Sequence, residues 1–533
     1  MEKKEKGLNA FSAKLDHLFR VTERGSSVGA EVKAGMGAFC IAVCALLMNT
    51  QTIGTYYGNY AGAYLVVSLI AFIGTLLLGV VCNLPVLQIA NMGMSAALVS
   101  LLGSNTGLTY ANVMFVTFLA AVIYLVIVVT PLKKIFIEAI PDGVKKALPV
   151  GIGLYVIGTA LKNAGLVSAE GSFVSASGLT NLDWFYYVLL FVGIVLVIVY
   201  FAAGRKNPLG STYLILILAM WVGGIVFYQE YFMGGQTATT VVYQRLNLVV
   251  ATDGANPYNL FTGLSSLQFG KLFSEGLDFS AYTEAGGNVA LFIVESVMTF
   301  LFLGMYTNLG NCRGALAAAD LDDEKWAADG EKKALFIGAV LNVVSPLFGG
   351  TPTAIGSQSA VETKDGGKTG LASLIASIGF LIALFSWIFF ALFATSTNGV
   401  GMWINDTETK LAAYVQDGFA FADLIMVFAG ALMLKSVMKV NLKKAEEFVS
   451  FIATLVGIVF FQDLVLGVAI GTILYGVLKA ISMVREKNFK SFNVQVLVLV
   501  VIFAVYAFIA LKYGGNYVTV SNNMMMPPMM PPM

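Results

Sequence analysis

Charged residues are scarce in this sequence, and histidine is nearly absent. Asp, Glu, Lys and Arg make up 12% of the 533 residues, whereas 58% are hydrophobic; a soluble chain usually carries about 25% charged residues. No water-soluble core can bury so much apolar surface, but a bilayer can accept it. Because His17 is the single histidine, a histidine metal site and a histidine proton relay are excluded. The net charge of +1 points to neither a nucleic acid nor an acidic partner.

The cysteines, and the sequence motifs typical of soluble enzymes, indicate no catalytic or metal site either. Cys40, Cys44, Cys82 and Cys312 all lie in or at the end of apolar segments. Cys40 and Cys44, one helical turn apart, could form a metal pair, but small packing residues are the favoured interpretation. The GGKTG segment at 366–370 lacks the upstream glycine of a phosphate loop and predicts a turn. We therefore expect no metal, no cofactor and no enzymatic activity.

Long apolar runs dominate the chain. A transmembrane helix needs about 20 apolar residues. On that measure, spans are predicted near 34–54, 60–82, 85–103, 107–130, 144–162, 182–203, 209–228, 288–311, 333–349, 350–362, 370–395, 418–437, 446–461 and 463–482. The run 493–511 predicts either a fifteenth span or an interfacial helix, and the Met/Pro tail after it is typical of disorder.

The basic residues support this topology. Lys and Arg are concentrated in the N-terminal arm and in alternate connections, such as 133–146 and 439–444. The positive-inside rule then gives fourteen spans, a cytoplasmic N-terminus and a multi-pass protein of the plasma (cell inner) membrane. The predicted divisions are a cytoplasmic arm (1–33), a first repeat (34–228), an outer loop (229–287), a second repeat (288–483) and a C-terminal hydrophobic segment with the tail (484–533).

Each half contains an interrupted third segment. Seven spans, a long loop and seven more spans indicate a duplicated unit, and an odd number of spans inverts the second copy. The third segments read NLPVLQIANMGMSAALVSLL, with Pro85, and GGTPTAIGSQSAVETK, with Pro352 and Gly356. Irregular backbone at membrane depth is tolerated where it is packed in protein or lines a cavity. The pattern predicts a site at the bilayer midplane, although 350–362 could also be a simple polar loop.

Glu295 is the group best placed for proton coupling. It lies in the apolar segment LFIVESVMTFLFLG, and Thr299 shares its helix face one turn later. A carboxylate at that depth costs several kcal/mol unless it is paired, hydrated or protonated. The alternative is a packing glutamate that bonds a neighbouring span.

Gln358 is the second candidate. Its planar amide, flanked by Ser357 and Ser359, could pair side by side with a planar ligand that carries adjacent N–H and C=O groups. We expect Gln358 to face Glu295 across one cavity.

Three other polar residues are weaker candidates for the binding site. Asn49 is an amide near the membrane interior, where a packing hydrogen bond is the favoured interpretation. Asp423 and Asp463 lie close to predicted helix ends, where capping or solvation explains them.

Several segments together resemble the nucleobase–cation symporter family of xanthine/uracil permeases, and most of all its hypoxanthine/guanine/adenine branch. They are IPDGVKKALPVGIGLYVIGTALKNAGLV at 140–167, GGKTGLASLIASIGFLIALF at 366–385 and ALMLKSVMKVNLKKAEEFVSFIATLVGI at 431–458. The resemblance implies an all-α fold of seven plus seven inverted spans, with a core domain (spans 1–4 and 8–11) and a gate domain (spans 5–7 and 12–14). It also implies a homodimer and proton-coupled uptake.

The resemblance assigns roles to the site residues. Glu295 matches the span 8 acid that binds the base and couples to protons, and Gln358 falls where the branch has Glu and xanthine/urate members have Gln. Gly93, Met94 and Ser95 match the span 3 part of the site, with Ser95 in place of the usual Asn. Thr50 follows Asn49 where the family has Pro, and the extra span 8 Asp residues of the branch are missing.

The leading hypothesis is proton-coupled uptake of purine-type nucleobases (hypoxanthine, guanine, adenine or xanthine) by an elevator-like movement. The alternatives are an anion transporter of the same inverted-repeat architecture, and a channel or non-transporting membrane receptor. A channel usually lines its path with repeated polar faces, whereas this sequence has one deep carboxylate.

Overall fold

The computed structural model describes residues 12–58, 60–105, 107–163, 260–385, 427, 429–434, 437, 444–461, 463–486 and 494–513. The predicted spans near 182–203 and 209–228, most of the span near 418–437, Asp423, the first part of the outer loop and the Met/Pro tail lie outside the described residues. The prediction of fourteen spans in two repeats therefore stays a prediction.

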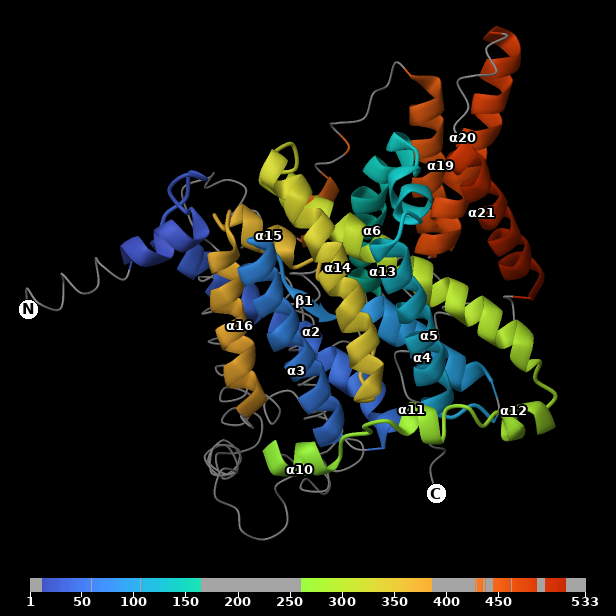
Figure 1. Cartoon of the computed structure of the whole chain (residues 1–533), viewed down its shortest axis with the longest axis horizontal. Helices are drawn as coiled ribbons and strands as arrows, with labels where there is room; N and C mark the ends of the chain where they lie inside the picture. Colours follow the sequence, from blue (N-terminus) through green and yellow to red (C-terminus); the bar gives the residue numbers. More distant parts are fainter. Residues whose placement is uncertain are drawn as a thin grey trace, which may run out of the picture.

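The described chain is mostly helical (Figure 1). Before residue 164 its elements are α2 (Val28–Tyr57), α3 (Tyr60–Leu77), the π-helical turn η1 (Leu78–Cys82), β1 (Gln88–Ala90), α4 (Met92–Ser104), α5 (Tyr110–Val129), the π-helical turn η2 (Lys134–Glu138) and α6 (Asp142–Asn163). After residue 259 they are α10 (Leu260–Ser265), α11 (Lys271–Ser274), α12 (Ser280–Glu284), α13 (Val289–Ala318), α14 (Lys325–Leu347), β2 (Thr353–Ile355), α15 (Ser359–Lys364), α16 (Gly370–Phe385), α19 (Ala445–Phe461), α20 (Leu464–Glu486) and α21 (Val494–Tyr513).

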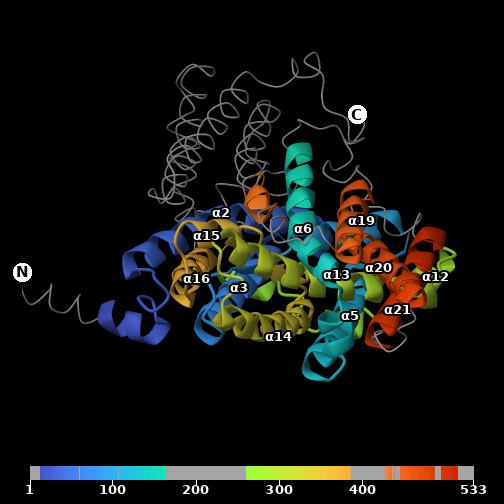
Figure 2. The same ribbon diagram turned by 90° about the horizontal axis from the view of Figure 1, so that it is seen from above.

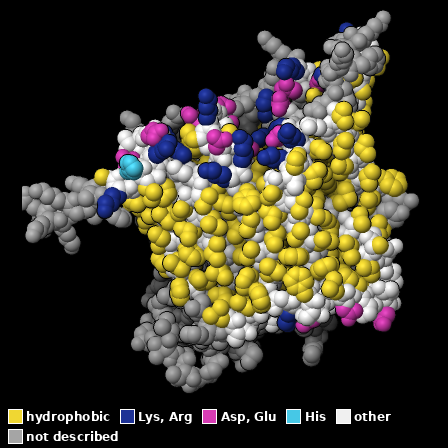
Figure 3. All heavy atoms as spheres, in the orientation of Figure 1, with side chains coloured by type: hydrophobic (Ala, Val, Ile, Leu, Met, Phe, Trp, Pro, Cys, Tyr) yellow, Lys and Arg dark blue, Asp and Glu magenta, His cyan; other side chains and the backbone are white. Residues whose placement is uncertain are grey.

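The outer surface is suited to a membrane. Within the described ranges, four helices are long and apolar enough to cross one: Ala61–Cys82, Tyr110–Val129, Val289–Ala318 and Leu464–Arg485. Large apolar side chains such as Phe385, Phe460 and Val494 point outward. Figure 3 shows them as a continuous apolar band, with most of the visible charged side chains gathered along one edge. Lipid solvates such a band, whereas water would not.

The two interrupted segments meet at a short β-ribbon. β1 pairs antiparallel with β2, with Gln88 opposite Ile355 and Ala90 opposite Thr353. Each strand is followed directly by a half-helix, α4 after β1 and α15 after β2. The predicted pattern of an extended, Pro-containing stretch followed by a helix is therefore confirmed in both segments. The simple polar loop considered for 350–362 is wrong, because that segment forms β2 and α15.

Side-chain amides satisfy the outer edge of β2. Asn342 of α14 accepts the Thr353 N–H and donates to the Thr353 carbonyl, both at 2.8 Å. On α13, Asn308 accepts the Ile355 N–H at 3.0 Å, and Asn311 donates to the Ile355 carbonyl. A backbone group without a partner costs several kcal/mol in a bilayer. These amides let a strand exist at that depth.

The edge of β1 is satisfied in the same way. The Thr75 hydroxyl of α3 lies 3.1 Å from the backbone nitrogen of Gln88 and 3.2 Å from the backbone carbonyl oxygen of Gln88. Asn49 of α2 donates to the Ala90 carbonyl at 3.0 Å. Both edges of the ribbon are thus closed by polar side chains from four different helices.

The N-terminal arm is docked onto the second half of the chain. Arg24 donates to the Lys368 carbonyl at 3.2 Å and lies 3.8 Å above the Trp326 ring. Burial lowers the pKa of the Arg24 guanidinium to about 10, so it stays cationic at neutral pH. Glu31 is fully buried and accepts the Lys368 N–H at 2.9 Å, next to the start of α16. The helix of the first predicted span, α2, begins at Val28, earlier than the predicted boundary at 34.

The amide caps of the ribbon can be tested by substitution. Asn342→Ala leaves the N–H and the carbonyl of Thr353 unpaired, and we expect it to lower the free energy of unfolding by about 1–3 kcal/mol. Thermal unfolding of the purified protein in detergent measures this loss.

A matched control is Asn105→Ala. Asn105 is also buried, but its amide donates to Leu101 within its own helix, so no strand loses a partner. Equal melting temperatures for the two variants would contradict the role given to Asn342.

Candidate functional site

The start of α4 lies at the end of β1 and is held by hydrogen bonds. Asn91 caps the helix, and its side-chain oxygen accepts the Met94 N–H at 3.0 Å. The buried Ser95 hydroxyl donates to Asn49 at 2.6 Å. The Asn49 amide nitrogen donates to Ala45 and to Ala90 at the end of β1. Asn49 and Ser95 are therefore brought together, and their polar atoms fix α2, β1 and α4 to one another.

The start of α15 is equally enclosed. Ser357, Gln358 and Ser359 are all buried. The Ser359 hydroxyl accepts the Leu87 N–H at 2.9 Å, which ties α15 to the residue before β1. A Cβ at Gly356 would lie 2.6 Å from the Gln358 side-chain oxygen, so the amide of Gln358 packs directly over this glycine. Two half-helix N-termini with buried polar side chains thus flank one ribbon.

The helix α13 presents Gly304 to the first turn of α4. A Cβ added at Gly304 would meet only the sulfur of buried Met94, at the ordinary contact distance of 3.9 Å. A Cβ at half-buried Gly93 would lie 3.7 Å from the hydroxyl of Tyr155, which belongs to α6. The first turn of α4 therefore faces Gly304 of α13 and the Tyr155 hydroxyl of α6. We take this region, with the start of α15, as the candidate site.

Glu295 is buried, as predicted. Its side chain is 2% exposed, and neither carboxyl oxygen has a hydrogen-bond partner among the described residues. The hydroxyl of Thr299, one turn later, is also buried without a partner there. An ionised carboxylate in such surroundings is costly, because nothing replaces the water that it loses. The packing alternative, in which Glu295 bonds a neighbouring span, finds no support in the described residues.

Glu295 does not face Gln358. Glu295 and Gly304 are nine residues apart on α13, which at 3.6 residues per turn puts them on roughly opposite faces. Asn308, which bonds β2, is thirteen residues beyond Glu295, or about 20 Å along the helix. The expectation of one cavity shared by Glu295 and Gln358 is therefore wrong. An apolar run in the sequence predicts that a residue is buried, but it does not predict which neighbouring helix that residue faces.

The face of α13 that carries Glu295 packs against the last helix. Phe302 lies two turns after Glu295, and its ring centroid is 5.1 Å from that of Phe503 in α21. The Tyr506 ring of α21 meets Phe302 edge to face at 6.0 Å. The run 493–511 thus forms a helix packed on α13 and α20. In Figures 1 and 2, α21 lies beside α20 in both views.

Two residues that the sequence did not single out, Tyr155 and Tyr506, lie near Asp463 at the start of α20. Asp463 accepts the N–H groups of Val465 and Leu466 at 2.8 and 3.0 Å and so caps α20, as its position predicted. It also lies within electrostatic range of Tyr155 and Tyr506, which capping alone did not predict. The two tyrosines belong to apolar runs, and their spacing carried no signal.

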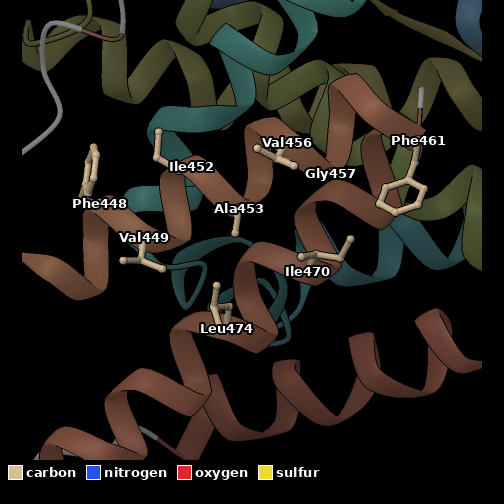
Figure 4. Close-up of a pocket in the computed structure, with 9 residues that line it drawn as sticks. All are labelled: Phe448, Val449, Ile452, Ala453, Val456, Gly457, Phe461, Ile470 and Leu474. Carbon is tan, nitrogen blue, oxygen red and sulfur yellow. The ribbon is translucent and has the colours of Figure 1, made fainter.

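The open groove between α19 and α20 is a different feature (Figure 4). It is lined by apolar side chains, among them Phe448, Ile452, Val456 and Leu474. A binding site needs a few polar groups to orient its ligand, and this groove offers none. It is therefore not the candidate site.

Comparison with known proteins agrees with the resemblance seen in the sequence. No family model matches the chain. The guanine/hypoxanthine permease PbuO of Bacillus subtilis is 25% identical over 501 residues, which cover 92% of this chain and 100% of PbuO. The adenine permease AdeP of Escherichia coli is 23% identical over 87% of this chain and 90% of AdeP. The guanine/hypoxanthine permease GhxP of Escherichia coli O157:H7 is 24% identical over 86% of this chain and 89% of GhxP.

Among solved structures, the transmembrane domain of the cyanobacterium bicarbonate transporter BicA gives a TM-score of 0.39 at 16% identity, with 90% of this chain and 97% of that chain covered. SLC26A9 gives a TM-score of 0.37 at 14% identity, with 84% and 65% covered. The sequence comparisons are the informative ones. They confirm that the chain resembles the purine permease branch of the nucleobase permeases over about nine-tenths of its length.

Proposed function

We propose that this chain is a secondary active transporter that takes up purine-type nucleobases together with protons, by an elevator-like movement of its core domain. The observation that carries the proposal is the similarity, over nearly the whole chain, to permeases named for guanine, hypoxanthine and adenine. The proposal includes insertion in the plasma membrane with a cytoplasmic N-terminus, and a homodimer.

The chemistry of the candidate site supports a neutral planar ligand. The Gln358 amide offers one acceptor and two donors in one plane, which matches the adjacent N–H and C=O groups of a purine base. The starts of α4 and α15 add the positive ends of two helix dipoles. These favour ring nitrogens and carbonyl oxygens, which are acceptors.

The site residues divide into two roles in this proposal. Gln358, Ser357, the backbone of Gly93 and the side chain of Met94 contact the base. Asn49, Ser95 and Ser359 hold the elements in place, because their polar side-chain atoms already bond β1, α2 or the segment before β1.

An anion is the less suitable cargo. Helix N-termini attract anions, and this is the one feature that favours the anion-transporter alternative. However, none of the described residues that form the candidate site is Lys or Arg, so no fixed cation balances an anion there. A channel or a receptor has no specific observation in its favour.

Uptake measurements test the function directly. We expect cells that express this chain to accumulate radiolabelled guanine, hypoxanthine or adenine, and a protonophore to abolish the accumulation. One proton carried per base supports about tenfold accumulation for each unit of pH difference.

Glu295→Gln keeps the size of the side chain but cannot bind the proton, so it should equilibrate the base without concentrating it. Full protonophore-sensitive accumulation by this variant would remove Glu295 from the coupling role.

Specificity tests the role of Gln358. Gln358→Glu replaces two N–H donors by acceptors, so the order in which unlabelled purines and xanthine compete with the labelled base should change. The competition profile in cells at fixed external pH measures this. Asn105→Ala serves as the control, since Asn105 bonds its own helix. An unchanged order for Gln358→Glu would exclude Gln358 from base recognition.

The space beside Gly304 provides a third test. Gly304→Leu fills the region between α13 and Met94, and we expect it to raise the Kd of the folded protein for the base at least about tenfold, the equivalent of 1.4 kcal/mol. Gly35→Ala is the contrasting variant, because its Cβ would lie 2.2 Å from the Ala372 carbonyl oxygen. It should destabilise the protein without changing the Kd of the folded fraction. Normal binding by Gly304→Leu would place the base elsewhere.

A further inference from the structure

A fully buried carboxyl group on the half-helix α15 has no part in the site described so far. Glu362 is 0% exposed. It lies one turn after Gln358, to whose carbonyl oxygen its backbone N–H donates at 3.4 Å. One of its carboxyl oxygens, Oε2, has no hydrogen-bond partner among the described residues. A carboxylate in such a position is costly, because nothing replaces the water that it loses.

A second buried carboxyl group close by shows what Glu362 lacks. Glu31 of α2 is also fully buried, but its two oxygens accept the backbone N–H groups of Lys368 and Thr369, at 2.9 and 3.3 Å. Glu362 packs beside the same turn, since a Cβ at Gly367 would lie 3.3 Å from its Cγ. Backbone donors of this kind stabilise a buried carboxylate. Among the described residues, they bond Glu31 and not Glu362.

The carboxyl group of Glu362 does contact the hydroxyl of Ser373 in α16, which lies 3.2 Å from Oε1. A hydroxyl donates one hydrogen and accepts two. The Ser373 oxygen already accepts the Val86 N–H at 2.8 Å, and the Leu84 carbonyl oxygen is its nearest acceptor, also at 2.8 Å. A buried carbonyl group at membrane depth needs a partner, so the single hydrogen of Ser373 is directed there. The contact with Glu362 then lacks a hydrogen unless the carboxyl group supplies it.

Other ionisable groups surround this end of α15. The described ones are Glu31 on α2, Cys312 and Arg313 on α13, Cys82 in η1, Arg24 in the N-terminal arm, and Lys364, Asp365 and Lys368 beside Glu362 in the chain; α16 has none. The acids and the cysteines cannot neutralise a carboxylate. The two arginines and the two lysines are the cations that could balance an ionised Glu362.

Those cations are bound away from Glu362. Arg313 forms two N–H···O bonds with a glutamate of α14, at 2.8 and 2.9 Å. The Lys368 ammonium group and the Arg24 guanidinium group donate to backbone carbonyl oxygens. Lys364 lies two positions after Glu362, a spacing at which side chains of a helix do not face each other. A proton is therefore the cation that this carboxyl group can take up.

We propose that Glu362 is a proton-binding site inside the protein and carries its proton in the conformation that the structure describes. Its O–H donates to the Ser373 oxygen, which also accepts the Val86 N–H and donates its own hydrogen to the Leu84 carbonyl oxygen. This arrangement gives every hydrogen one acceptor and leaves no buried charge. Loss of the proton places a carboxylate against a hydroxyl lone pair, and the contact between α15 and α16 becomes repulsive.

The proton acts on the base site through α15, and this role, unlike the proton site itself, rests on the proposed function. Ser359, three residues before Glu362 on the same helix face, ties α15 to the segment before β1. Protonated Glu362 ties that face to Ser373. Gln358 stands at the start of this half-helix, so its position depends on both contacts. High pH then weakens base binding through α15, without any change at Glu295.

Infrared spectroscopy of the purified protein in detergent detects the proton directly, with no substrate present. A protonated carboxyl group has a C=O stretching band that a carboxylate lacks. Glu362→Gln keeps the size of the side chain, and its amide can donate to Ser373 in place of the O–H. At pH 7, the difference spectrum between wild type and Glu362→Gln should show the loss of one such band.

Glu331→Gln is the matched control for the infrared measurement. Glu331 is a half-buried or buried glutamate of the same region, but it is paired with Arg313 at 2.8 Å, so its replacement should remove no band of a protonated carboxyl group. Full band intensity in Glu362→Gln would overturn the proposed proton site.

The pH dependence of stability gives a second measurement. Above about pH 4.3 the unfolded chain ionises a glutamate, whereas the folded protein keeps this proton, so the unfolding equilibrium constant rises about tenfold per pH unit. Glu362→Gln removes that loss of stability. Its melting temperature relative to wild type should therefore increase steadily from pH 5 to pH 7, also in a Glu295→Gln background. A difference that does not change with pH would contradict the proposal.

Purine binding separates this proposal from the proposed function. The Kd for guanine, hypoxanthine or adenine should rise with pH in wild-type protein, and the rise should be smaller in Glu362→Gln. The predicted infrared band without binding of any purine would contradict the nucleobase function alone. Purine binding by a protein whose infrared band is unaffected by Glu362→Gln would contradict the proton site alone.

Discussion

The fold depends on one constraint: every backbone N–H and carbonyl at membrane depth needs a partner inside the protein. A continuous helix meets it alone, but an interrupted helix does not. Here the two interrupted segments pair with each other as β1 and β2, and Asn342, Asn308, Asn49 and Thr75 bond their outer edges. The ribbon fixes α4 and α15 with their N-termini inside the protein, which leaves polar backbone groups for a ligand at that level.

The helix α13 connects this region to the second polar feature. Its Asn308 and Asn311 hold β2, and its Gly304 leaves room beside Met94. On the side that carries Glu295, its Phe302 packs against Phe503 and Tyr506 of α21. A base bound at the ribbon and a proton bound at Glu295 would both be sensitive to where α13 stands. Coupling through a shared helix needs no contact between the two cargoes, provided that each binds one position of α13 more tightly than another.

The sequence predicted the features that depend on local composition. Apolar length located most described helices, Pro and Gly located both interrupted segments, and isolation in an apolar run marked Glu295 as buried. It did not predict the direction that Glu295 faces, because the rotation of α13 is set by contacts with Phe503, about 200 residues away in the chain. The neighbours of Asp463 were not predicted for the same reason: a capping pattern is local, whereas Tyr155 and Tyr506 come from distant helices.

Equilibrium binding to the purified protein tests the central claim, that the site beside the ribbon holds a neutral purine base. Radiolabelled guanine, hypoxanthine or adenine would be titrated onto wild-type protein, with unlabelled purines, uracil, bicarbonate and sulfate as competitors. The account predicts saturable binding of at least one purine, displaced by purines and unaffected by the anions. Saturable anion binding together with no detectable binding of any purine would contradict it.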